Sequence, residues 1–87
     1  MGIYKVKQEK GQQRNINWEA VGQRLRTLRG DMTQAQFAKR IGASQGYLSH
    51  LERGEKEIGP EILLRISQIC DRSMEWILTG SERGPHR

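Results

Sequence analysis

The side chains most suited to binding chemistry lie between residues 45 and 53, on one side of a predicted helix. The residues on that side are Gln45, Gly46, Ser49, His50 and Arg53. The amide of Gln45 carries a donor and an acceptor side by side, which matches the N6 and N7 groups of adenine in the major groove of DNA. The pattern therefore predicts that Gln45 is the best placed to contact a base, and that Ser49, His50 and Arg53 can contact base edges or phosphates. For His50 the alternative is an ordinary surface side chain.

A preceding helix and a short turn are predicted to position this surface. Thr33 is a suitable N-cap, and Gln36, three residues later, completes a capping box. Gly42 can adopt the left-handed conformation that ends a helix, and Ser44 can cap the next one. Each helix has an apolar face, made of Phe37, Ala38 and Ile41 in the first and of Tyr47, Leu48 and Leu51 in the second. Proteins place a helix in the major groove with two helices joined in this way.

The segment resembles the Cro and phage-repressor (XRE-type) helix-turn-helix family. The positions that carry the resemblance are Thr33, Gln34, Ala38, Gly42, Ser44, Leu48, Ser49, Leu51, Glu52 and Gly54. The similarity extends from about Asn17 to Gly80. It implies an all-α fold, a compact five-helix lambda-repressor-like domain in which helices 2 and 3 form the helix-turn-helix.

The resemblance also implies roles for individual residues. Gln34 matches a position whose side chain and backbone N–H bind a phosphate at a helix N-terminus. Gln45 and Ser49 match base-contacting positions, and Ser44 matches a cap that also touches a phosphate or a thymine methyl group. Gly46 departs from the pattern, because many relatives have a longer polar residue there. We therefore expect fewer direct base contacts and more dependence on DNA shape.

Further residues beside this helix are candidates for phosphate contacts, with a solvated charge as the alternative for the basic ones. They are Tyr47, Lys39, Arg53 and Lys56. By resemblance, Arg29 forms a partly buried ion pair with Glu52 that joins the first helix to the DNA-reading unit. Removal of one partner alone is expected to cost more than removal of both, because a buried charge is left unpaired.

Composition and patterning divide the chain into three parts. Residues 1–16 carry four basic side chains and one acidic one without helical periodicity, and are expected to form a flexible arm. A solvated leader and a basic arm that follows the phosphates are both compatible with this segment. Apolar and polar residues alternate weakly at positions 3–6, which could pair as a short strand. Residues 17–80 are expected to form the DNA-binding domain, and residues 81–87 a flexible tail.

The remaining helices follow from their end signals. The first is predicted to run from the N-cap Asn17 to Gly30, and its link to Thr33 is about two residues shorter than is common in the family. The fourth begins at Pro60 and the fifth after Ser73. The fifth helix contains more apolar side chains than one contact face can cover. Trp76 or Ile77 is therefore expected at a subunit interface, with core packing as the alternative.

Several classes of function find no support in the sequence. His50, His86 and Cys70 have no metal-ligand spacing, and there is no glycine-rich phosphate loop, so neither an enzyme nor a cofactor is expected. A single cysteine excludes an intrachain disulfide. Because neither a leader nor an apolar run of membrane-spanning length is present, a cytoplasmic protein without membrane contact is expected.

The sequence thus predicts a transcriptional regulator that binds double-stranded DNA sequence-specifically, and a repressor in particular. One recognition helix covers few base pairs, so a homodimer on an inverted-repeat operator with half-sites about 34 Å apart is expected. The alternative is an antitoxin of a toxin–antitoxin pair, which binds a toxin as well as DNA. A restriction–modification controller protein is also compatible with the size.

Overall fold

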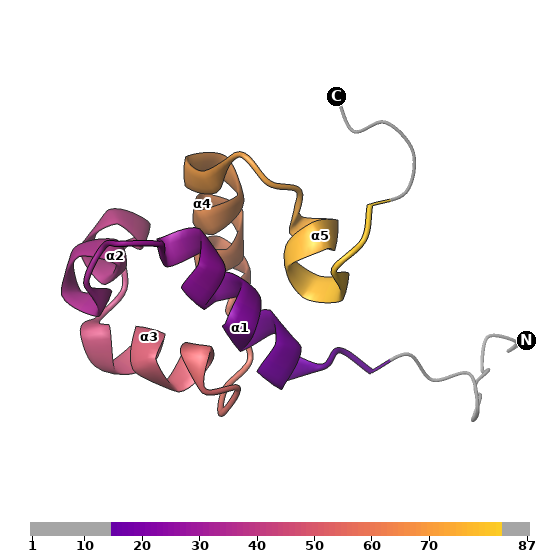
Figure 1. Ribbon diagram of the computed structural model, residues 1–87, viewed down its shortest axis with the longest axis horizontal. Helices are drawn as coiled ribbons and strands as arrows, with labels where there is room; N and C mark the ends of the chain where they lie inside the picture. Colours follow the sequence, from indigo (N-terminus) through magenta and orange to yellow (C-terminus); the bar gives the residue numbers. More distant parts are fainter. Residues whose placement is uncertain (1–14, 83–87) are drawn as a thin grey trace, which may run out of the picture.

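The computed structural model describes residues 15–82, which contain five helices and no strand (Figure 1). The helices are α1 (Trp18–Arg29), α2 (Gln34–Ile41), α3 (Gln45–Glu52), α4 (Pro60–Cys70) and α5 (Met74–Thr79). The predicted all-α, five-helix fold is confirmed. Within these residues no helix is long and apolar enough to cross a membrane. Most of the predicted arm and tail, and His86, lie outside the described residues.

Local capping signals set where the helices begin. The side chain of Asn17 accepts a hydrogen bond from the Ala20 N–H at 3.1 Å and caps α1. The capping box of α2 is complete, because Thr33 accepts from the Gln36 N–H and the Gln36 side chain accepts from the Thr33 N–H. Ser73 caps α5 in the same manner. These side chains satisfy donors that a helix N-terminus would otherwise leave unpaired.

The short link between α1 and α2 is closed by hydrogen bonds of its own. The Met32 N–H donates to the Arg29 carbonyl at 3.2 Å. The Arg29 guanidinium in turn donates to the Met32 carbonyl at 3.0 Å. The tight entry into α2 is therefore held by the last residue of α1.

The five helices surround one apolar core. α1 packs against α3 and α5, α2 packs against α3 and α4, and α4 packs against α5. In Figure 1, α1 runs through the middle of the molecule, between α3 and α5. The buried apolar residues are Val21, Leu25, Phe37, Ala38, Ile41, Leu48, Leu51, Ile58, Leu63, Ile66 and Ile77. Ile16, the last residue of the predicted arm, also packs against this core.

The expectation that Ile77 serves a subunit interface is corrected by the structure. Its exposed fraction is 0%, so it is part of the core of the single chain. The expectation assumed that α5 has a single contact face. The helix packs against both α1 and α4 and therefore buries a wide arc of its surface. Trp76 is half-buried, and Met74 at the start of α5 is exposed.

Gly22 allows α1 and α3 to come together. A Cβ at this position would lie 2.5 Å from the Glu52 carbonyl oxygen and 2.6 Å from that of Leu51. Backbone oxygens cannot yield as the end of a flexible side chain can. A residue without a side chain is therefore required at this crossing.

We expect Gly22→Ala to lower the free energy of unfolding by roughly 1–3 kcal/mol, because the added methyl group overpacks the crossing. Urea denaturation followed by circular dichroism measures the change. Gly46→Ala is the matched control, since it is also a helical glycine but has no atom within 4 Å of the added Cβ. It should raise stability by roughly 0.5–1 kcal/mol through helix propensity. Equal effects of the two substitutions would contradict the role of Gly22.

Candidate nucleic-acid interface

The turn between α2 and α3 is made of three residues, 42–44. Gly42 has φ 76° and ψ 32°, the left-handed conformation that glycine adopts at least cost. Its N–H donates to the carbonyls of Ala38 and Lys39, and Ser44 accepts from the Tyr47 N–H at 3.1 Å to start α3. The same three residues therefore end α2 and begin α3.

The polar face of α3 is left at the surface. Leu48 and Leu51 are buried beneath it. Gln45 and Gly46 at the N-terminal end are exposed, and Ser49 is half-buried. The predicted base-contacting end of α3 is thus open, while its apolar side attaches the helix to the core.

The other residues predicted to contact phosphate differ in whether their side chains already have a partner within the chain. Lys39, Lys56, Arg53 and Ser44 are exposed. Gln34, the first residue of α2, donates from its amide nitrogen to the Glu52 carboxylate at 3.0 Å. A glutamine amide has a second N–H and an acceptor oxygen, so this bond leaves Gln34 able to bind a phosphate.

The structure contains the ion pair between Arg29 and Glu52. Two parallel hydrogen bonds join them, from Arg29 Nε to Oε2 at 2.7 Å and from Nη2 to Oε1 at 2.9 Å. Arg26 Nε lies 4.0 Å from the same carboxylate. The Glu52 side chain is only 2% exposed, so the carboxylate depends on these partners and on Gln34 for the interactions that water would otherwise provide.

The surroundings of Glu52 shift its acid–base equilibrium. Burial alone acts to raise the pKa of the carboxyl group. The hydrogen bonds from Arg29 and Gln34 outweigh burial, together with the positive charges of Arg29 and Arg26, and hold the pKa of Glu52 below its ordinary value. Glu52 is therefore ionised at neutral pH although it is buried.

The predicted phosphate contact by Tyr47 is not supported. Its hydroxyl donates to the Glu57 carbonyl at 3.2 Å and accepts from the Gly59 N–H at 3.0 Å. A phenol has one O–H proton, and here it is already used within the chain. Tyr47 ties α3 to the loop before α4.

A network at the C-terminal end of α3 includes an acidic residue that the sequence analysis missed. His50 Nδ1 lies 2.7 Å from Glu55 Oε1, and Arg53 Nε donates to Glu55 Oε2 at 3.0 Å. Arg53 Nη1 also donates to Ser49 Oγ at 2.6 Å. His50 and Arg53 are therefore joined to Glu55, and Ser49 is joined to Arg53, although all three were predicted to contact DNA. A charge of opposite sign two residues after Arg53 was the available signal.

The structure shows one further arginine whose role sequence reasoning missed. Arg65 of α4 donates from Nη1 to the Ile41 carbonyl at 2.9 Å and so binds the C-terminal end of α2. A cation is favourable at this end of a helix dipole. Because 24 positions separate the two residues, only the tertiary fold reveals the contact.

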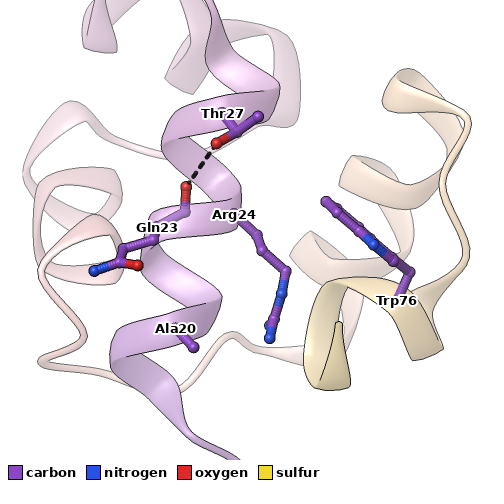
Figure 2. Close-up of a pocket in the computed structure, with 5 residues that line it drawn as sticks. All are labelled: Ala20, Gln23, Arg24, Thr27 and Trp76. Atoms are coloured by element: carbon purple, nitrogen blue, oxygen red, sulfur yellow. Dashed lines mark hydrogen bonds between the residues drawn. The ribbon is translucent and has the colours of Figure 1, made fainter. Parts of the chain in front are cut away.

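Trp76 borders a surface hollow of about 310 Å³ between α1 and α5. Figure 2 shows the Arg24 side chain extending from α1 toward Trp76, with Ala20, Gln23 and Thr27 along α1. The guanidinium carbons of Arg72 and Arg24 lie 3.7 Å and 6.0 Å from the indole ring centre. Cation–π contacts within this distance hold Trp76 against its own chain.

The geometry defines a small helical domain with a helix-turn-helix whose second helix is open to a ligand. A comparison with protein families matches residues 23–77 to the helix-turn-helix family. The chain belongs to this family, and the predicted XRE-type, lambda-repressor-like resemblance is confirmed. A search of curated proteins finds no match.

Solved structures that resemble this chain include gene regulators. The P22 c2 repressor, in complex with synthetic operator 9T in the presence of Tl⁺, is 33% identical, with a TM-score of 0.66 over 70% of this chain and 96% of that one. The clp gene regulator ClgR from C. glutamicum is 36% identical, with a TM-score of 0.61 over 75% and 87%. The restriction-modification controller protein C.AhdI from Aeromonas hydrophila is 25% identical, with a TM-score of 0.62 over 70% and 91%.

These relatives and the family support DNA binding in transcriptional regulation as the class of function. They point to a regulator and not to an enzyme. Among residues 15–82, no group of three or more His, Cys, Asp or Glu side chains is placed to hold a metal ion.

We expect Arg29→Met to lower the free energy of unfolding by about 3 kcal/mol, the lower end for a buried pair because the Arg29 side chain is 21% exposed. The double variant Arg29→Met/Glu52→Gln should lose less, since no buried charge is left unpaired. Urea denaturation of the parent, both single variants and the double variant measures the coupling. Additive losses would contradict a coupled pair.

The lowered pKa of Glu52 also predicts a pH dependence. Its ordinary value is 4.5, so its contribution to stability is fully present above that pH and is lost as the pH falls through the lower pKa of the folded state. The difference in unfolding free energy between the parent and Glu52→Gln should therefore narrow as the pH is lowered from 7 to 3. A constant difference over this range would contradict the shift.

Proposed function

We propose that the chain is a homodimeric transcriptional regulator, a repressor in particular, that binds an inverted-repeat operator and occludes a promoter. The observation that carries this proposal is the open polar face of α3, which the turn at residues 42–44 and the buried Leu48 and Leu51 fix in place. The likeness to a repressor that was solved with an operator supports it.

In this proposal the residues of α2 and α3 have different roles in DNA binding. Gln45 at the exposed N-terminal end of α3 reads a base edge, and Ser49 and His50 contribute further contacts. Gln34 binds a phosphate at the N-terminus of α2, where the helix dipole favours negative charge. Further phosphate contacts, which position α3 without reading sequence, come from Lys39, Ser44, Arg53 and Lys56.

Dimerisation is required because one α3 helix covers few base pairs. Because Ile77 is buried, we propose that the interface uses other residues of α5. Met74 is 41% exposed, and Trp76, two residues later and therefore on another side of α5, is half-buried. Sedimentation of the protein with and without its operator tests the dimer.

Selection of duplexes from a random DNA pool at physiological salt is the experiment that tests the function. An enriched inverted repeat with half-sites one helical turn apart is expected. Salt-sensitive binding without enrichment would overturn sequence-specific recognition. The antitoxin alternative would then gain weight, but only if a small partner protein binds the chain stoichiometrically.

On the selected operator, Gln45→Ala should weaken binding by about 1–3 kcal/mol and relax the choice of base at one position of each half-site. Fluorescence anisotropy with the operator and its single-base variants measures both effects. Gln68→Ala is the matched control, since Gln68 is an exposed glutamine on α4. Unchanged affinity of Gln45→Ala for every duplex would show that α3 is not the reading helix.

A further inference from the structure

Three of the five N–H donors of the Arg53 guanidinium are engaged within the chain. Nε and Nη2 donate to the two oxygens of Glu55 at 3.0 Å and 3.2 Å, and Nη1 donates to Ser49 Oγ at 2.6 Å. The two bonds to Glu55 use the planar edge that recognises a carboxylate or a phosphate by paired hydrogen bonds. Glu55 therefore occupies one of the two edges through which the guanidinium could bind a DNA phosphate by paired hydrogen bonds.

The same carboxylate also holds His50, whose Nδ1 lies 2.7 Å from Glu55 Oε1. The hydrogen bonds from Arg53 and His50 lower the pKa of Glu55 to about 2. Glu55 is thus ionised throughout the physiological range and adds a negative charge beside the proposed DNA-binding face. A phosphate that approaches Arg53 finds Nε and Nη2 already paired with Glu55, and the negative charge of Glu55 repels it.

We propose that Glu55 is an intramolecular competitor of the DNA backbone, which pairs with Arg53 and His50 in the free protein and must be displaced before Arg53 binds phosphate and His50 contacts DNA. This inference rests on the DNA-binding function proposed above. Its consequence is that affinity for DNA is lower than the basic residues of the domain would allow.

The chain offers a matched control for a loss of negative charge. Glu57 is also exposed and lies two residues further along the same loop, and only its backbone carbonyl is used, by Tyr47. Glu55→Gln and Glu57→Gln therefore change the net charge equally, but only the first removes the charge that pairs with Arg53. Neither position is in the core, so both variants should fold as the parent does.

Binding of a random-sequence duplex at several salt concentrations tests the proposal. Glu55→Gln should bind on the order of fivefold more tightly than the parent, and Glu57→Gln less than twofold more tightly. The slope of log affinity against log salt should steepen by about one for Glu55→Gln, because one more phosphate is neutralised. In an Arg53→Met background, Glu55→Gln should give no more than the small gain of Glu57→Gln.

Three results would overturn the competitor role while leaving the proposed function intact. They are equal gains for the two glutamine variants, weaker binding by Glu55→Gln, and a full gain without Arg53. If the parent and all variants bind no duplex, the proposed function itself fails and the competitor role falls with it. An NMR signal of the Arg53 Nε–H in the DNA-free protein, present in the parent and in Glu57→Gln but lost in Glu55→Gln, reports the pair independently of DNA.

Discussion

The buried carboxylate of Glu52 is the interaction on which the rest of the arrangement depends. Among residues 15–82 it is the one charged residue that is buried. Its partners come from two other helices, Arg29 from α1 and Gln34 from α2. A buried charge is tolerated only when it is paired and hydrogen-bonded. A packing that moved α3 away from α1 would leave that charge without Arg29, and movement away from α2 would remove the hydrogen bond from Gln34. The carboxylate therefore favours one orientation of α3.

The close approach and the ion pair occur at the same end of α3. Gly22 faces the carbonyls of Leu51 and Glu52, and the Glu52 side chain meets Arg29 at the same crossing. The C-terminal end of α3 is thus fixed by steric fit and by charge together. Its N-terminal end, with Gln45, projects away from these constraints and is available to a ligand.

Features that depend on neighbours in the sequence were predictable, and features that depend on distant elements were not. The caps at Asn17, Thr33 and Ser44 follow from local hydrogen bonding, so the helix starts were correct. The burial of Ile77 depends on two helices that flank α5, and the bond of Tyr47 to Gly59 depends on where the next loop passes. The ion pair of Arg29 came from family resemblance, since 23 positions separate its partners.

The fixed and the open end of α3 differ in which substitutions they tolerate. At Gly22 every alternative residue adds at least a methyl group against the backbone of α3. Positions 45 and 46 have free space around them, so a new side chain there disturbs no packing. Under the proposed function, the preferred DNA sequence can therefore change by one substitution at a time while the packing that holds α3 stays the same.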